Sequence, residues 1–272
     1  MRLIVFILAL SLLPLTGACS ERKARTLHGY DLCQRGVRRL ETGVLRICDQ
    51  LNEAVVSQAI SQLRDDDTEV LLTSGGGVVS AAITLVEALN ARHITVRVRQ
   101  FCLSACSTDV LLAAEKVVVE PHTIVAFHHT GAFAAEVMAD RSGMSADSPF
   151  RQQATREREF FEREGLDPDL LNQIAMSIEP ICMGIRRQGS GRERYLNFRK
   201  AWFVPDRIEA DRMFRGRLSG YWPASGSQAQ AILRPTLGDG DLTVSYGPLA
   251  SSMSPAKMAA QLPVCPGSLP GG

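Results

Sequence analysis

The chain has 272 residues, of which 30 are basic and 29 acidic, so its formal net charge at pH 7 is +1. This balance excludes a general electrostatic attraction to nucleic acid, and we expect no nucleic-acid partner. About 250 residues remain once a leader is removed, which suits one ordinary domain or one domain with an arm.

The beginning of the chain predicts a secretory signal peptide over residues 1–18. Arg2 supplies the positive charge, an apolar run follows at 3–15, and small residues precede Cys19. The run is shorter than a membrane span. Cleavage after Ala18 would leave Cys19 first, which resembles a bacterial lipobox, although Thr16 stands where that motif usually has leucine. We expect export to the periplasm, either with a lipid on Cys19 as the sole membrane anchor or after plain cleavage.

Six cysteines remain after Cys19, an even set that fits disulfide bonding in an oxidising compartment. They are Cys33, Cys48, Cys102, Cys106, Cys182 and Cys265. Six cysteines allow fifteen pairings, and we favour only the local pair Cys33–Cys48, leaving the rest open. Their spacing and the few histidines do not indicate a zinc site, and we expect no metal.

Strands alternate with helices through the first half of the sequence. Apolar and β-branched runs predict strands at 44–48, 69–73, 94–98, 116–119 and 124–127. Apolar residues at helical spacing predict helices at 53–64, 81–89 and 105–114, the first of them capped by Asn52. This alternation predicts an α/β fold in which helical crossovers join the strands of a parallel sheet.

The pattern changes after His129. We expect an arm or loop at 131–149, a charged helix at 151–164, a helix opening at 167–168, a flexible turn at 188–191, a strand at 201–204 and a helix at 206–214 that begins with Pro205 at N1. From Leu218 onward the glycines, prolines and serines predict no helix.

Ser104 lies at the turn between the strand at 94–98 and the helix that follows it. The N-terminus of a helix favours developing negative charge, so this place suits a nucleophile. Serine is also a common helix N-cap, and the turn alone does not decide between the two.

Two more features of this kind stand at the ends of strands. Gly75, Gly76 and Gly77 follow the strand at 69–73, where glycine allows a backbone N–H to approach a bound atom or simply makes a tight turn. No Gly-Lys-Ser/Thr or spaced Gly-x-Gly-x-x-Gly follows, which excludes the usual phosphate loops. His128 and His129 follow the strand at 124–127. Histidine is the usual base for a serine nucleophile. Taken alone, either residue is also compatible with a half-buried structural histidine whose ring is hydrogen-bonded.

The order of these three features resembles the Clp-type serine peptidases, of the Clp/crotonase superfamily. Members have a strand and Ser-Pro-Gly-Gly before a helix, then Ala-Ser-Met-Gly at a helix start, then proline and a strand that ends in histidine. The matching pieces here are Ser-Gly-Gly-Gly-Val at 74–78, Leu-Ser-Ala-Cys at 103–106, Leu-Leu-Ala-Ala at 111–114, Pro121 and the strand that ends at His128. The resemblance covers about 44–129 well and 150–214 more loosely, and with the leader it suggests an exported bacterial branch.

The resemblance implies a fold and a division of the chain. The fold would be a spiral of β-β-α units with a parallel sheet and a helical handle. The chain would divide into the signal peptide 1–18, a tether and arm at 19–43, a Clp-like α/β domain at 44–217 with its handle at about 131–200, and a C-terminal extension at 218–272.

The resemblance also implies residue roles. Ser104 would be the nucleophile and His128 its general base, because the step from Pro121 selects His128 over His129. The backbone N–H groups of Gly77 and Ala105 would form the oxyanion hole, where the loss of one donor typically costs about 10²–10³ in turnover.

One departure from the family concerns the third member of the triad. Ala201 stands where the family has its aspartate; Asp206 is the nearest carboxylate in sequence, and Glu193 lies farther back. Exported signal-peptide peptidases with a similar fold use a Ser–Lys dyad, but the absence of lysine between Lys116 and Lys200 disfavours that mechanism.

The sequence therefore predicts an exported serine hydrolase, a peptidase, that needs no cofactor and acts on peptides or proteins. Because the family forms stacked rings, a homo-oligomer is implied. A non-catalytic envelope protein that uses the same scaffold for peptide binding or assembly is the alternative, favoured by the missing aspartate. A crotonase-type acyl-CoA enzyme shares the spiral sheet, but export separates it from a cytosolic cofactor.

Overall fold

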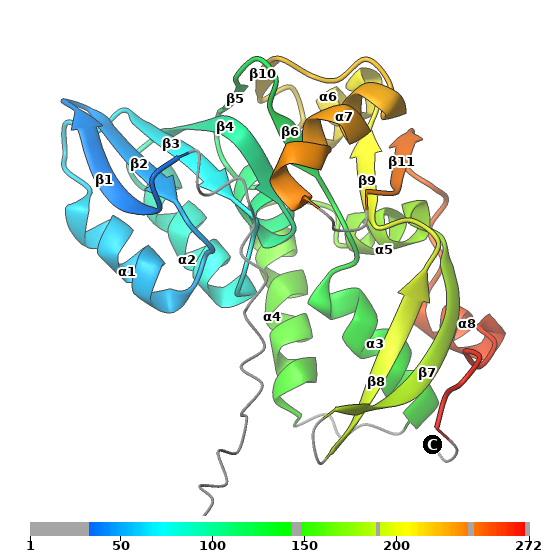
Figure 1. Ribbon diagram of the computed structural model, residues 1–272. Coiled ribbons are helices and arrows are strands. Elements are labelled where there is room, and N and C mark those ends of the chain that lie inside the picture. Colours follow the sequence, from blue (N-terminus) through cyan, green and yellow to red (C-terminus); the bar gives the residue numbers. More distant parts are fainter. Residues whose placement is uncertain (1–32, 143–147, 189–190, 239–241, 270–272) are drawn as a thin grey trace, which may run out of the picture.

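The strands of the first half assemble into one mainly parallel sheet (Figure 1). The computed structural model describes residues 33–142, 148–188, 191–238 and 242–269, so the predicted signal peptide and Cys19 lie outside the described residues. Within that part of the chain the sheet order is β1-β2-β3-β4-β5-β10, with β6 paired to β4. Its strands are β1 (Gly36–Glu41), β2 (Val44–Cys48), β3 (Glu69–Ser74), β4 (Thr95–Leu103), β5 (Val117–Val119), β6 (Ile124–Ala126) and β10 (Leu218–Gly220). The predicted α/β fold with a parallel sheet is confirmed; the pairing of β1 with β2 is antiparallel.

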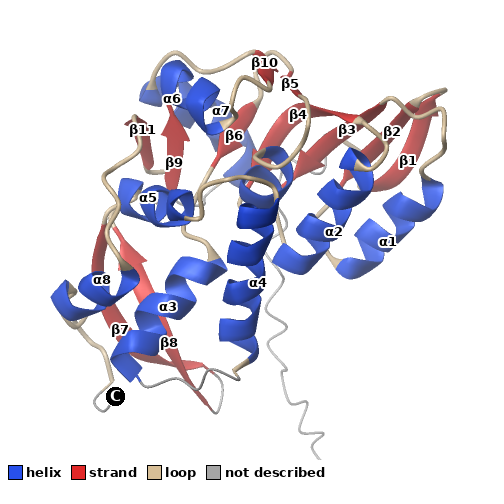
Figure 2. Cartoon of the chain, turned by 180° about the vertical axis from the view of Figure 1, so that it is seen from behind, coloured by secondary structure: helices blue, strands red, loops and turns tan. Residues whose placement is uncertain are grey.

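The helices of the first half cover one face of this sheet. Helices α1 (Glu53–Gln62) and α2 (Val79–Asn90) lie side by side there (Figure 2). The Asn52 side chain accepts a hydrogen bond from the backbone N–H of Val55 and caps α1, as the sequence predicts. Both helices turn small and branched apolar residues to the sheet, which buries the continuous apolar run of β3 and the inward-facing valines of β4.

Strand β4 is longer than predicted and changes partners along its length. Val96–Val98 pair with β5, whereas Phe101–Leu103 pair with β6. Gln100, between the two segments, has a φ of +64°, so the strand bends where it changes partner. The predicted end at residue 98 is therefore wrong, because the alternating pattern stops at the bend while the hydrogen bonding continues. The extension places the ends of β4 and β6 next to each other.

The handle contains more regular structure than the sequence predicts. Its helices are α3 (Gly131–Ser142), α4 (Pro149–Arg163) and α5 (Asp169–Ser177), and its hairpin is β7 (Pro180–Gln188) with β8 (Gly191–Phe198). The expected loop at 131–149 is wrong for α3, whose alanines hide the helical period. Phe133 and Val137 of α3 instead join a second apolar cluster with Met258 and Leu262.

The C-terminal part also packs onto the main body. It contains β9 (Trp202–Pro205), α6 (Arg207–Met213), α7 (Gly226–Leu237), β11 (Val244–Gly247) and α8 (Pro255–Gln261). Two helices thus follow Leu218, where none was predicted. Strand β10 extends the main sheet beside β5, and β11 pairs with β9. Pro205 ends β9 and Asp206 caps α6, so the predicted helix start at Pro205 is corrected to Arg207.

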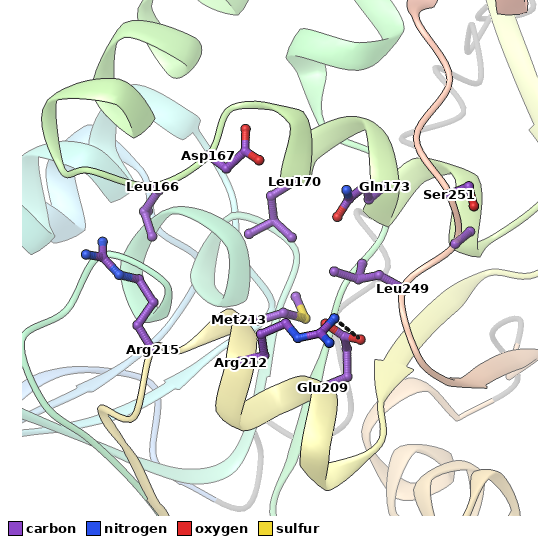
Figure 3. Close-up of a pocket in the computed structure, with 11 residues that line it drawn as sticks. Leu166, Asp167, Leu170, Gln173, Glu209, Arg212, Met213, Arg215, Leu249 and Ser251 are labelled. Atoms are coloured by element: carbon purple, nitrogen blue, oxygen red, sulfur yellow. Dashed lines mark hydrogen bonds and ion pairs between the residues drawn. The ribbon is translucent and has the colours of Figure 1, made fainter.

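A cavity of about 460 Å³ lies between α5, α6 and the segment at 249–251 (Figure 3). Leu170 and Met213 supply apolar lining, and Arg212 lies at its edge within 3.4 Å of the Glu209 carboxylate. Neither Ser104 nor His128 lines this cavity. In the described part of the chain, no helix has both the length and the apolar character needed to cross a membrane.

Candidate active site

Ser104 lies in the sharp turn between the end of β4 and the short π-helix η2 (Cys106–Leu111). Its φ is +60°, a left-handed conformation that costs a non-glycine residue about 1–3 kcal/mol and that recurs at functional turns. The surrounding structure holds it there: the Ser104 N–H donates to Ala126 O at 3.3 Å, and the Ser104 carbonyl accepts from the Thr108 N–H at 2.9 Å and from the Ser107 hydroxyl at 2.8 Å. The helix-cap interpretation does not hold, because Ala105 is the N-cap of η2 and makes no side-chain cap.

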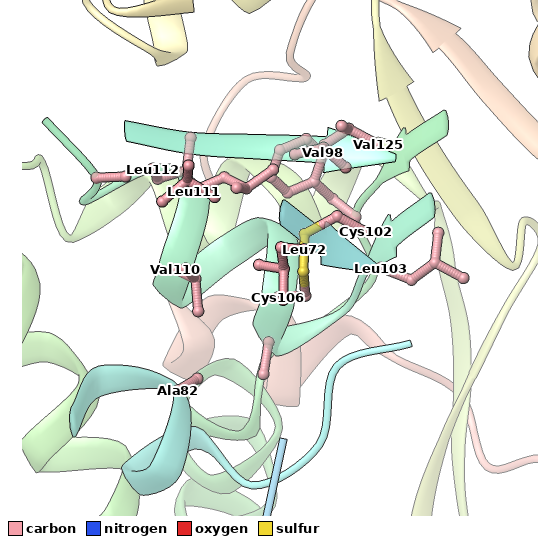
Figure 4. Packing of buried hydrophobic residues seen from close by; sticks show 14 of the residues in the cluster. Leu72, Ala82, Val98, Cys102, Leu103, Cys106, Val110, Leu111, Leu112 and Val125 are labelled. Carbon is pink, nitrogen blue, oxygen red and sulfur yellow. A yellow bond between two sulfur atoms is a disulfide. The ribbon is translucent and has the colours of Figure 1, made fainter. Parts of the chain in front are cut away.

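A disulfide between Cys102 and Cys106 encloses this turn (Figure 4). Its Cα atoms are 5.3 Å apart, and both cysteines are fully buried. The sulfurs pack with Leu72, Val110 and neighbouring core residues beneath the turn. The bond ties the end of β4 to the first residue of η2, which restricts the backbone on either side of Ser104.

The other cysteines pair as well. The predicted pair Cys33–Cys48 is joined, with Cα atoms 6.2 Å apart. Cys182 of β7 joins Cys265, which the sequence left unassigned, and ties the hairpin to the C-terminal segment.

His128 follows β6 and points its ring at the serine. Its Nε2 lies 2.5 Å from Ser104 Oγ. Burial lowers the pKa of His128 to about 4, and a hydrogen bond to the backbone of His129 opposes this with a smaller effect. The ring is therefore neutral at pH 7, so Nε2 accepts a hydrogen bond from the serine hydroxyl while Nδ1 carries the ring proton, a tautomer assigned from these contacts.

His129, the alternative base, lies edge to face against the His128 ring, with centroids 5.1 Å apart, and has no hydrogen bond to Ser104 among the described contacts. Its ring stacks on Phe198 of β8, with centroids 4.4 Å apart and planes 15° from parallel. Burial, and secondarily the neighbouring His128, lower its pKa to about 3. The structure thus brings Ser104 together with His128, the histidine that the sequence selects.

The glycine loop after β3 lies against the serine turn through Gly76. A Cβ added to Gly76, whose φ is +89°, would lie 2.6 Å from the Ser104 Cβ. Gly77, which the sequence selects, has a φ of +145°, and its Cβ would meet the Leu51 carbonyl at 2.2 Å. The backbone N–H groups of Gly77 and Ala105 take no part in the turn and cap hydrogen bonds of the described residues. Gly76 was missed because three consecutive glycines look alike in a sequence.

Asp206 does not lie beside His128. Its carboxylate accepts a hydrogen bond from the Glu209 N–H at 2.9 Å and caps α6. Among the described residues no carboxylate shifts the pKa of His128, and the side chain of Glu193 lies outside them. The structure therefore shows Asp206 as the cap of α6, and the third member predicted from the sequence stays a prediction.

Trp202, which the sequence analysis did not select, also packs against His128. The two ring centroids are 5.4 Å apart and the planes are perpendicular. The only sequence signal is its place in the last predicted strand. No group of three or more His, Cys, Asp or Glu side chains within the described residues is arranged to hold a metal ion.

This geometry defines an α/β protein with a serine–histidine pair at the carboxyl ends of two neighbouring strands. No protein-family model matches the chain, and no curated protein matches it significantly. In a comparison of structures the chain is similar to the ClpP protease catalytic domain from Plasmodium falciparum, with a TM-score of 0.40, 11% identity, and coverage of 67% of this chain and 86% of that one. It is also similar to a ClpP1 variant from Listeria monocytogenes, with a TM-score of 0.36, 17% identity, and coverage of 49% and 78% respectively.

Proposed function

We propose that the protein is a serine hydrolase that cleaves peptide bonds by acyl transfer. The observation that carries this proposal is the 2.5 Å contact between Ser104 Oγ and the neutral His128 Nε2 at a strained strand-to-helix turn. A separation of roughly 3 Å or less is what a serine and its general base require. Serine is unreactive without such a base, so the contact supports a catalytic pair.

The steps follow from the atoms present. His128 Nε2 takes the proton of Ser104 Oγ as the oxygen attacks the substrate carbonyl carbon. The N–H of Ala105 and a glycine N–H of the loop at 75–77 donate to the oxyanion that forms. The imidazolium then gives its proton to the leaving amine, and water hydrolyses the acyl-enzyme by the same route in reverse.

The low basicity of His128 sets an expectation for rate. No described carboxylate stabilises the imidazolium, and burial opposes its formation. Loss of the triad acid costs roughly 10⁴ in turnover in the well-characterised serine protease case. We therefore expect slow turnover, with the rate rising as His128 loses its proton above about pH 4.

The cellular setting is part of the same proposal. The leader at 1–18 supports export to the periplasm, and Cys19 offers a lipid anchor. Three joined cysteine pairs are compatible with an oxidising compartment. The substrate would be a peptide or protein, no cofactor is needed for the steps above, and the Clp-type resemblance suggests a homo-oligomer.

Labelling with a fluorophosphonate probe tests the function directly. The oxidised wild type should be labelled, and Ser104→Ala should abolish labelling. Ser57→Ala is the matched control, because Ser57 is exposed on α1 and should leave labelling unchanged. A folded, oxidised wild type that never reacts with the probe would rule out the catalytic proposal.

A second candidate is peptide binding without turnover. It is favoured by the absence, among the described residues, of any carboxylate acting on His128. Under this alternative the unlabelled wild type would still bind a peptide library, and Ser104→Ala would bind equally well.

A further inference from the structure

The position of Trp202 follows from the pairing between the end of β6 and β9. Phe127 and Phe203 form an antiparallel bridge in which each N–H donates to the other's carbonyl, at 2.8 and 2.7 Å. In an antiparallel ladder the next pair is not hydrogen-bonded, and its side chains lie closer together. That next pair is His128 and Trp202.

The alternation of side chains along a strand decides which neighbour faces His128. Phe127 and Phe203 are fully buried on the core side, so residues 128 and 202 turn to the opposite side together. Ala201 is one step further and turns back to the first side. The residue at the flank of His128 is thus Trp202, and the alanine at the family's aspartate position does not share that face.

The backbone of β9 fixes Trp202 from its other edge. The Trp202 N–H donates to the Thr243 carbonyl at 3.0 Å, where β11 runs parallel to β9. The indole therefore stands on a strand that is held on both sides. Its ring meets the imidazole edge to face at 5.4 Å, a favourable arrangement for two aromatic rings.

A triad carboxylate has two tasks: it holds the imidazole in one orientation, and it stabilises the imidazolium. A rigid indole performs the first task by contact, but it supplies no negative charge for the second. The remaining ring nitrogen is served by the backbone of His129. The titratable side chain packed against the ring is His129, whose ring centroid lies 5.1 Å away. No charged side chain of the described residues on β4, β8 or β9 acts on the ring.

We propose that Trp202 is the positioning residue of His128, its indole packing edge to face against the imidazole and holding it against Ser104. This proposal rests on the proposed function, because positioning matters to a reaction of Ser104. It makes the site a serine–histidine pair held by an aromatic side chain and a backbone group.

The experiment measures His128 directly by NMR titration of its imidazole, and separately the pH dependence of probe labelling. Trp202→Phe should keep the His128 pKa well below 6.5 and the labelling rate within a few-fold. Trp202→Ala should move the pKa toward 6.5 and lower the plateau labelling rate about 10- to 100-fold, because the ring is no longer held. Trp202→Asp should raise the His128 pKa above 6.5, because a carboxylate then faces the ring.

Two controls separate positioning from general damage. Ala201→Asp adds the same charge to the neighbouring residue on the other face and should move the His128 pKa less than Trp202→Asp does. The His129 titration should not move in Trp202→Phe, because its ring rests on Phe198. If Trp202→Ala does not fold, Trp202→Leu gives the same comparison with most of the volume retained.

The two readouts also separate this proposal from the one it rests on. A wild type without labelling ends the hydrolase proposal, and the NMR titration then still decides whether Trp202 holds His128. If His128 titrates identically in wild type, Trp202→Ala and Trp202→Leu, the positioning role is overturned whatever the labelling shows.

Discussion

Two buried pairs of polar groups lie close together in the sequence, one with a residue just before η2 and the other with a residue within it, and burial shifts their pKa values in opposite directions. The first is Ser104 with His128. The second is Asp109 of η2 with Glu157 of α4, both almost completely buried. In the first pair the base stays neutral by giving up its proton, with a pKa of about 4. In the second, burial raises the pKa of Glu157 to about 7 and that of Asp109 well above its usual value, so the pair keeps a proton that two exposed carboxylates would have lost.

The difference lies in what each pair can do with its proton. Nε2 of His128 faces a hydroxyl donor, so a proton has a path from Ser104. Glu157 Oε2 accepts a hydrogen bond from the Ala132 N–H at 2.9 Å. The buried oxygens Glu157 Oε1 and Asp109 Oδ1 have no hydrogen-bond partner among the described residues. The acid pair links η2, α4 and the start of α3. A low-dielectric interior favours the neutral form in both cases, and only the first pair has a hydroxyl donor facing its base.

Among the variants that test the Ser104–His128 pair, we expect the largest loss of probe labelling from Gly76→Ala. The new Cβ would overlap the Ser104 Cβ and lie 2.6 Å from the Leu103 carbonyl oxygen, so the nucleophile turn must move. A 1 Å displacement can cost about 10²-fold in rate, and we expect at least that fall in probe labelling. Gly216→Ala is the control: its φ of +75° carries similar strain, but nothing lies within 4 Å of the added Cβ.

Thermal unfolding completes the Gly76 test. Both alanines should lower stability by roughly 1–3 kcal/mol through the left-handed backbone, and only Gly76→Ala should also lose labelling. Equal labelling in the two variants would show that Gly76 does not support the Ser104 turn.

The buried acids Asp109 and Glu157 should make the free energy of unfolding depend on pH. The pKa of Glu157 is raised in the folded state, so its contribution is present below about pH 4.5 and is lost as pH rises toward about 7. Glu157→Gln keeps a neutral side chain at every pH and should remove this loss, on the order of 3 kcal/mol by pH 8. Urea unfolding from pH 4 to 8 measures it, with exposed Glu159→Gln on the same helix as control.

The histidines act in the opposite direction within the same experiment. The pKa values of His128 and His129 are lowered in the folded state, so their contribution is present above about pH 6.5 and is lost as pH falls toward 4 and 3. Glu157→Gln should leave this acid limb intact. If the Glu157→Gln variant and the wild type have the same dependence of stability on pH above pH 5, Glu157 is not protonated in the folded protein.

The parts of this site that could be predicted are those set by local sequence. Ser104 and His128 each follow an apolar strand, and parallel strands present their carboxyl ends at one edge, so their meeting follows from the α/β pattern. Trp202 could not be found this way, because its place depends on one bridge between Phe127 and Phe203, residues far apart in the chain. Helix α3 was missed for a related reason: its alanines become a buried face only against α4 and α8.

The smallest expected effect concerns Asp206, which the sequence offered as the third member. Its carboxylate caps α6, so Asp206→Ala should lower stability by about 1 kcal/mol, as loss of an N-cap typically does. Labelling should be unchanged, because the carboxylate is engaged with the Glu209 N–H. Asn52→Ala, which removes the cap of α1, should cost a similar amount of stability. If labelling falls for Asp206→Ala but not for Asn52→Ala, and the His128 pKa falls with it, this carboxylate reaches His128 in solution. The first pair of the comparison would then be a serine and a histidine with an acid, and its contrast with the acid pair would have to include that charge.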